Sequence, residues 1–133
     1  LIPNVLKAAL TNDSSLKVFG DDYPTPDGTC VRDYVHVSDL AQAHLLGLEY
    51  MKDNKEFAAF NLGNGDGFSV LEVIKSCEKI ADTKIPLQIE ERRDGDPAVL
   101  ISENKRAVEV LNWDPKYNDI SNIIKSAWSW HNT

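Results

Sequence analysis

The sequence of 133 residues has few cysteines, few arginines and no long apolar run, and each shortage excludes a class of protein. Its two cysteines, Cys30 and Cys77, stand in unlike surroundings without metal-ligand spacing, so we expect reduced thiols rather than a disulfide scaffold. No segment approaches the roughly 20 apolar residues of a membrane-spanning helix, and we see no signal peptide. The formal net charge of −7 argues against nucleic acid and anionic membranes as partners. We therefore expect a cytoplasmic globular protein.

Motifs for two common chemistries are also missing. His36, His44, Asp33 and Asp39 do not stand at the spacing of a zinc site, so we expect no metal. The nucleophile motif G-x-S-x-G is absent, which argues against hydrolysis. The first residue, Leu1, is not methionine and opens a pattern typical of a helix already under way. We therefore expect a piece of a longer protein.

One stretch, PTPDGTCVRDYVHVSDLAQAH (residues 24–44), combines a turn, a strand and the start of a helix. Its prolines and its Asp-Gly pair predict the turn, and a strand follows over 31–37. Alternation along that strand places Arg32, Tyr34 and His36 on one face. An arginine, a phenol and an imidazole on one face can form an anion site with an aromatic wall. The alternative is a solvated strand face.

Periodicity predicts one domain of mixed α/β structure. Apolar residues at helical spacing predict helices, and short extended runs predict strands. Asp39 with Gln42, and Ser69 with Glu72, can cap two of the helices reciprocally. Because apolar residues surround the helix over 40–51, we expect it to be buried on most sides. The predicted helices are 1–10, 40–51, 70–81, 103–111 and a last one from Ile120 to about Trp128; the predicted strands are 16–19, 31–37, 57–62 and 85–91.

The loop Gly63-Asn64-Gly65-Asp66-Gly67 lies between a predicted strand and a helix, as a dinucleotide-binding loop does. Its spacing differs from the G-x-G-x-x-G fingerprint. Asp66 in the loop and Glu72 in the first turn of the helix would also repel a pyrophosphate. We interpret the loop as a structural turn.

The stretch Arg92-Arg93-Asp94-Gly95-Asp96 is more specific, because Asp-Gly forces a turn beside a strand end. An arginine fork binds phosphate oxygens in pairs, which lysine cannot reproduce. A nearby aspartate can accept hydrogen bonds from sugar hydroxyls. The alternative is a surface ion pair between an arginine and Asp94 or Asp96.

Three strings carry a family resemblance: GDDYPTPDGTCVRDYVHVSDLAQAH, FNLGNGDGFSVLEVI and ERRDGDPA. They resemble the UDP-glucose 4-epimerase family of extended short-chain dehydrogenase/reductases. The resemblance runs from end to end of this chain but covers only the C-terminal part, less than half, of such an enzyme. Asp94 stands where the family usually has Glu, and Cys30 where it often has Gly; neither departure removes a ligand group.

The resemblance implies that residues 1–133 are an α/β substrate-binding part, with the NAD-binding Rossmann domain absent from this chain. The complete enzyme interconverts UDP-galactose and UDP-glucose by NAD-dependent oxidation and reduction at C4 of the sugar, in galactose metabolism. The implied site is made of residues that contact a UDP-sugar. Lys17, Val18 and Phe19 meet the uracil through their backbone, Arg32 and Arg93 hold the diphosphate, Tyr34 lines the pocket, and Asp96 binds the ribose.

The family's catalytic Tyr-x-x-x-Lys pair is absent, because no tyrosine of this chain has a lysine four residues later. We therefore expect no catalytic residue here and no activity from this chain alone. In the resembled fold the segment 57–62 joins the sheet of the NAD domain, so we expect a homodimer or swapped assembly through it or through the helix over 40–51. The alternatives are another nucleotide-sugar epimerase or dehydratase, or a non-catalytic nucleotide-sugar binding module.

Overall fold

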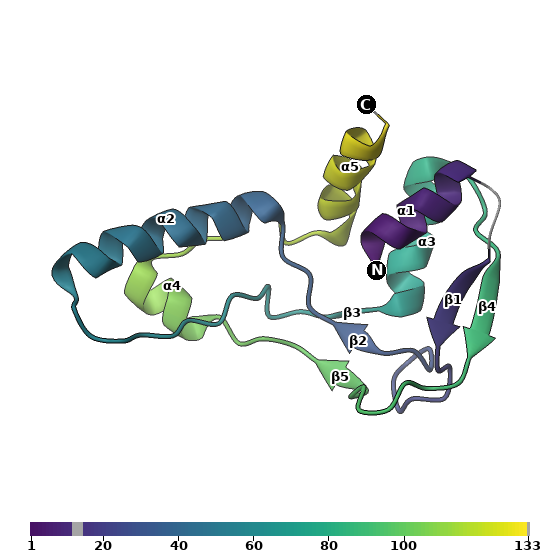
Figure 1. The fold of residues 1–133 in the computed structure, drawn as a ribbon, viewed down its shortest axis with the longest axis horizontal. Coiled ribbons are helices and arrows are strands. Elements are labelled where there is room, and N and C mark those ends of the chain that lie inside the picture. Colours follow the sequence, from purple (N-terminus) through teal and green to yellow (C-terminus); the bar gives the residue numbers. More distant parts are fainter. Residues whose placement is uncertain (12–14, 133) are drawn as a thin grey trace.

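In the computed structural model, which describes residues 1–11 and 15–132, two packed regions lie at opposite ends of an elongated molecule (Figure 1). Helices and short strands alternate, so the predicted mixed α/β class is confirmed. Within the described ranges, no helix is both long enough and apolar enough to span a membrane. The elements are α1 (Ile2–Thr11), β1 (Leu16–Phe19), β2 (Val31–Arg32), α2 (Val37–Asp53), β3 (Phe68–Ser69), α3 (Val70–Ala81), β4 (Leu87–Glu90), β5 (Val99–Leu100), α4 (Lys105–Leu111) and α5 (Ile120–His131).

The first region, which we call the lobe, consists of α1, α3, α5 and the parallel strands β1 and β4. Its helices follow the predicted periodicity, and each directs its apolar stripe toward the other two. Leu6, Ile74 and Ile124 are almost completely buried at their meeting point. The core of the lobe is built from Ile2, Val5, Leu6, Ala8, Val18, Val73, Ile74, Cys77, Ile85, Ile120, Ile123 and Ile124.

A polar network fixes the turn before β2 against the start of α3. Ser69 caps α3, and the predicted capping box with Glu72 is present. Asp27 accepts hydrogen bonds from the Ser69 hydroxyl and from the backbone and hydroxyl of Thr29. Burial alone would raise the pKa of Asp27, but these hydrogen bonds hold it below its usual range. The turn and the helix are therefore joined through one ionised carboxylate.

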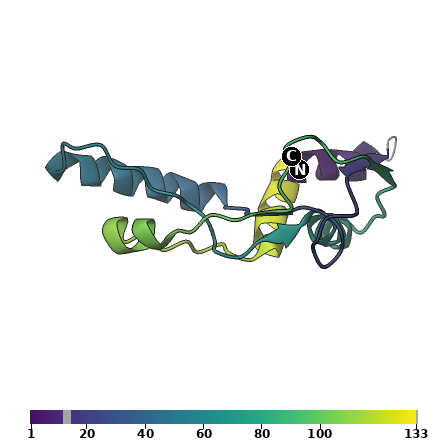
Figure 2. The same cartoon turned by 90° about the horizontal axis from the view of Figure 1, so that it is seen from below.

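The second region, which we call the arm, consists of α2, of α4 with Trp113 just after it, and of the segment 54–62 that follows α2. In both views α2 and α4 lie at the end of the molecule far from α1, β1 and β4 (Figure 1, Figure 2). The arm has a small core, and most of the apolar side chains of α2 are exposed, so the predicted burial of this helix on most sides is wrong. A single neighbouring helix cannot cover an apolar surface that extends around α2. The core of the arm is built from Ala43, Ala107, Leu111 and Trp113.

The start of α2 differs from the prediction. The helix begins at Val37, and His36 caps it by accepting a hydrogen bond from the Ser38 amide at 3.1 Å. Asp39 does not cap the helix with Gln42. Its buried carboxylate instead accepts the backbone amides of Lys116 and Tyr117 at 2.9 and 3.0 Å, because the chain entering α5 passes this side of α2.

Three predicted strands are shorter or absent. The strand predicted over 31–37 is reduced to β2, because the helix begins at Val37, and the one predicted over 85–91 is reduced to β4. The strand predicted over 57–62 does not form. A strand needs a neighbour to receive its backbone hydrogen bonds, and no strand of the described residues pairs with this segment.

Candidate functional site

The seven residues assigned to the site from the sequence line one cavity of about 380 Å³. The wall is formed by β1, by the chain around β2, and by the turn that follows β4. The cavity is also lined by residues that the sequence did not predict, among them Asn4 of α1, Cys30 and Val70. The predicted residues at the cavity are Lys17, Val18, Phe19, Arg32, Tyr34, Arg93 and Asp96.

Asp96 lies between the two arginines of the cavity. Its Oδ1 is 3.4 Å from Nη2 of Arg32, and its Oδ2 is 2.7 Å from Nη2 of Arg93. Two positive charges thus face one negative charge, which leaves the group with a net positive charge. Guanidinium groups held in this way offer further N–H donors to an anion in the cavity. The ion pair between an arginine and Asp96, the alternative reading of this stretch, is therefore present, and it belongs to a group with a net positive charge.

Each arginine is also held by a second contact. Arg32 donates from Nη1 to the carbonyl oxygens of Val31 at 2.8 Å and Pro97 at 2.9 Å. The guanidinium carbon of Arg93 lies 4.9 Å from the ring centroid of Phe19, in the geometry of a cation–π contact. The two cations are therefore positioned by the protein before a ligand arrives.

The other predicted residues complete the wall. Burial raises the pKa of Tyr34, so its phenol stays neutral at neutral pH and can donate a hydrogen bond. Val18 also lines the cavity and is almost completely buried. The ammonium of Lys17 pairs with Glu90 of β4 at 2.9 Å.

The alternation argument is confirmed for two of its three residues. Arg32 and Tyr34 both line the cavity, and Asp33 between them accepts the amides of Asn64 and Ser102 at 3.1 and 3.2 Å. His36 does not reach the cavity. It bonds Ser126 of α5 at 2.9 Å, because the chain has already turned into α2.

The glycine loop after residue 62 does not fit a dinucleotide phosphate. The start of α3 is already occupied, because Ser69 accepts the amide of Glu72 at 3.1 Å and Glu72 accepts the amide of Ser69 at 2.7 Å. A Cβ at Gly63 would lie 2.3 Å from Oδ2 of Asp33, so this glycine permits a close internal contact. No residue of the loop is therefore assigned to NAD.

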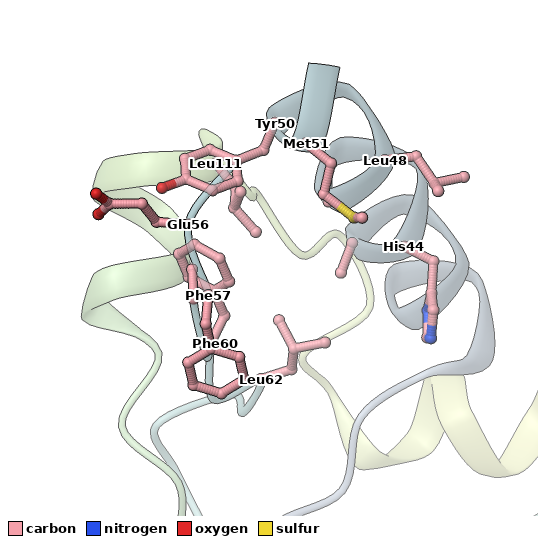
Figure 3. A pocket seen from close by; sticks show the side chains of 12 residues that line it. His44, Leu48, Tyr50, Met51, Glu56, Phe57, Phe60, Leu62 and Leu111 are labelled. Carbon is pink, nitrogen blue, oxygen red and sulfur yellow. The ribbon is translucent and has the colours of Figure 1, made fainter. Parts of the chain in front are cut away.

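A second and larger cavity, of about 600 Å³, lies in the arm between α2, α4 and the segment 54–62. Figure 3 shows side chains of α2 on one side of it and Phe57, Phe60 and Leu62 on the other. Its lining is mostly apolar, and Phe57 is almost fully exposed. It offers no group of charges to a small ligand. Among the described residues, no cluster of three or more His, Cys, Asp or Glu side chains could hold a metal ion.

Known proteins similar to this chain belong to one class of enzyme. The family model described as the NAD dependent epimerase/dehydratase family matches residues 1–63. The solved structures similar to this one have the fold of extended short-chain dehydrogenase/reductases. The chain therefore has the fold of the C-terminal part of such an enzyme.

Within this class, the more similar relatives include several UDP-glucose 4-epimerases. The one from Halalkalibacterium halodurans is 48% identical over 131 residues, which are 98% of this chain and 39% of that protein. A crystal structure of a UDP-glucose 4-epimerase matches with a TM-score of 0.93 and 48% identity, over 99% of this chain and 40% of that chain. The enzyme from Bifidobacterium longum, solved in complex with NAD+ and UDP, matches with a TM-score of 0.92 and 42% identity, over 99% of this chain and 39% of that chain. The predicted resemblance is confirmed, and the chain spans about two fifths of the length of these relatives.

Proposed function

We propose that this chain is the substrate-binding part of an enzyme that interconverts UDP-galactose and UDP-glucose with NAD. The observation that carries the proposal is the convergence of Arg32, Tyr34, Arg93 and Asp96 on one cavity. These residues come from distant parts of the sequence and supply what a nucleoside diphosphate needs: two guanidinium forks, an aromatic wall and a carboxylate. The sequence identity of 48% between this chain and the UDP-glucose 4-epimerase from Halalkalibacterium halodurans supports this proposal.

In this proposal Arg32 and Arg93 bind the diphosphate, and Asp96 accepts hydrogen bonds from the ribose hydroxyls. The uracil lies along β1, where Lys17, Val18 and Phe19 meet it through their backbone. Each charge-assisted hydrogen bond from an arginine contributes about 1.5–3 kcal/mol. Affinity stays weak, because the remaining walls of the site belong to the rest of the enzyme.

The direct test is calorimetry with UDP on this chain. We expect weak binding that falls as salt is added, because salt screens the attraction between arginine and diphosphate. Arg93→Ala should remove most of the binding heat. Arg106→Ala is the matched control, because Arg106 stacks on Phe60 in the arm, away from the cavity. Equal heats from the wild type and Arg93→Ala would refute the role of Arg93.

The catalytic step needs groups outside this chain. General acid–base catalysis requires a side chain within hydrogen-bond reach of the reacting proton, and the sequence has no Tyr-x-x-x-Lys pair. The rest of the enzyme, with its NAD-binding domain, would supply both that pair and the cofactor. We therefore expect the purified chain to convert no UDP-galactose to UDP-glucose when NAD is added, and turnover that survives repurification would contradict this.

We propose that the arm is the surface through which this chain contacts another domain or another copy of itself. In the complete enzyme, which we place in the cytoplasm, its apolar surface would pack against the NAD-binding domain, and in this chain alone against a second copy. Light scattering over a dilution series should show a dimer or swapped assembly that Leu48→Glu weakens. Leu10→Glu is the control, because Leu10 is an exposed leucine of the lobe. A wild-type chain that stays monomeric at high concentration would refute the assembly.

A further inference from the structure

The two consecutive arginines after β4 have different surroundings. Arg93 lines the cavity and lies over the ring of Phe19. Arg92 is not among the residues that line the cavity. Its Nε donates to Oδ1 of Asp22 at 2.6 Å, its Nη2 donates to the carbonyl oxygen of the same residue, and its guanidinium carbon lies 4.2 Å from the ring centroid of Tyr23.

One short segment, residues 19–23, contacts both arginines. Phe19 at its start lies under Arg93, and Asp22 and Tyr23 at its end hold Arg92. The segment turns at Gly20, which has a φ of +83°, a conformation that residues with a Cβ rarely adopt.

The packing around Gly20 leaves little space. A Cβ there would lie 2.5 Å from the ring of Tyr23 and 2.8 Å from Cγ of Arg92. The amide of Gly20 also donates to the carbonyl oxygen of Glu90 at 2.9 Å, which ties the segment to the end of β4. These contacts connect the position of Arg92 to the segment that carries Phe19.

We propose that Arg92 is a positioning residue for nucleotide binding: by holding Asp22 and Tyr23, it keeps Phe19 and the turn after β4 in the places that direct Arg93 into the cavity. The inference rests on the proposed function, because it requires Arg93 to bind the diphosphate. The hydrogen bond from Arg92 holds the pKa of Asp22 below its usual range, so the pair is ionised at neutral pH. The pair is also partly exposed, so its loss should change the site locally without unfolding the protein.

Two variants break the pair with opposite changes of charge. Arg92→Gln removes a positive charge near the site, and Asp22→Asn removes a negative one. If Arg92 positions Arg93, both variants of this chain should weaken UDP binding, by about fivefold each. If the charge of Arg92 acts on the ligand from a distance, Asp22→Asn should strengthen binding instead. Asp21→Asn is the matched control, because it removes the same charge one residue away and should leave affinity unchanged.

A double-variant cycle tests whether Arg92 acts through Arg93. In the Arg93→Ala background, Arg92→Gln should weaken UDP binding by less than it does in the wild type, because Arg93, the main group that it positions, is gone. Effects that multiply would show that the two arginines act independently, and would overturn the proposal. A fall in the thermal midpoint of Arg92→Gln as large as that caused by a core truncation would also overturn it, because the effect would then be structural.

A readout without ligand separates this inference from the proposed function. The side-chain Nε–Hε signal of Arg93 in a ¹⁵N spectrum is assigned by its loss in Arg93→Ala. It should shift in Arg92→Gln and in Asp22→Asn, and stay in place in Asp21→Asn. An unchanged signal in both pair variants refutes the positioning role even if UDP binds. A shifted signal in a chain that binds no UDP keeps the coupling between the arginines but refutes the proposed function, and with it the role in binding.

Discussion

The lobe buries Leu6, Ile74 and Ile124 almost completely, whereas the arm leaves Leu48 and Met51 more than half exposed. Both regions are built from amphipathic helices, so the difference lies in their number of neighbours. In the lobe three helices contact one another, and each covers the apolar stripes of the other two. In the arm α2 packs mainly against α4, and the neighbouring segments 54–62 and 112–119 form neither helix nor strand. A helix whose apolar surface extends around its axis needs more than one covering layer.

The comparison separates a core that its own helices close from an apolar surface that stays exposed. The cavity with the two arginines lies on the lobe side, where packing holds β1 and the start of α3 in place. The arm adds no residue to that cavity. We therefore expect nucleotide binding to depend on the lobe, and association with other protein to depend on the arm.

The largest expected effect is the difference in the free energy of unfolding between truncating a leucine of the lobe and truncating a leucine of the arm. Leu6→Ala in the lobe should lower the free energy of unfolding by about 2–5 kcal/mol, because it leaves a cavity in a closed core. Leu48→Ala in the arm should change it by less than about 0.5 kcal/mol, because the side chain is already in solvent. Urea unfolding of the two variants measures the difference. Equal losses would show that the arm is as well covered as the lobe.

A smaller loss of stability is expected at the joint between the regions, where Asp39 of α2 accepts the backbone amides of Lys116 and Tyr117 before α5. Asp39→Ala would leave the amides of Lys116 and Tyr117 without their acceptor, at a cost of roughly 1–3 kcal/mol in the free energy of unfolding. Asp53→Ala, at the exposed end of the same helix, is the control and should cost little. If both substitutions cost the same by urea unfolding, the carboxylate of Asp39 does not hold the joint.

The smallest expected effect is the response of the lobe to acid. The hydrogen bond from the amide of Ile85, helped by Lys84, holds the pKa of Glu78 below its ordinary value of 4.5. Because the folded pKa is the lower one, the unfolded chain takes up the proton first as the pH falls. The contribution of Glu78 is therefore complete above about pH 4.5 and is lost as the pH falls through the folded pKa.

Glu78→Gln keeps an oxygen acceptor for the amide of Ile85 but cannot titrate. The free energy of unfolding of the wild type should fall more steeply below pH 4.5 than that of Glu78→Gln, by less than about 1 kcal/mol in total, because Lys84, the ion-pair partner of Glu78, is almost fully exposed and solvent screens that pair. Glu109→Gln, on an exposed pair in the arm, should leave the curve as it is. Identical acid curves for the wild type and Glu78→Gln would contradict the assignment.

The helices and the capping box of α3 could be predicted because their signals are local. The spacing of apolar residues over 70–81 and the pair Ser69 and Glu72 determine that helix before any tertiary contact forms. The strand over 57–62 was predicted from the same kind of signal, but a strand also requires a partner. The two-residue strands β3 and β5 were missed, because they exist only through their pairing with β2.

The sequence alone determined which chemical groups this protein can offer: two arginine-bearing stretches, an aspartate and a tyrosine, in strings that resemble one enzyme family. It determined the face shared by Arg32 and Tyr34, because alternation is a property of the local backbone. Only the tertiary structure decided that Asp96 lies between Arg32 and Arg93, that Arg92 is held by Asp22 outside the cavity, and that α2 stays uncovered. The physical reason is that local geometry follows from neighbours in sequence, whereas ion pairs, cavities and burial depend on which distant segments the packing brings together.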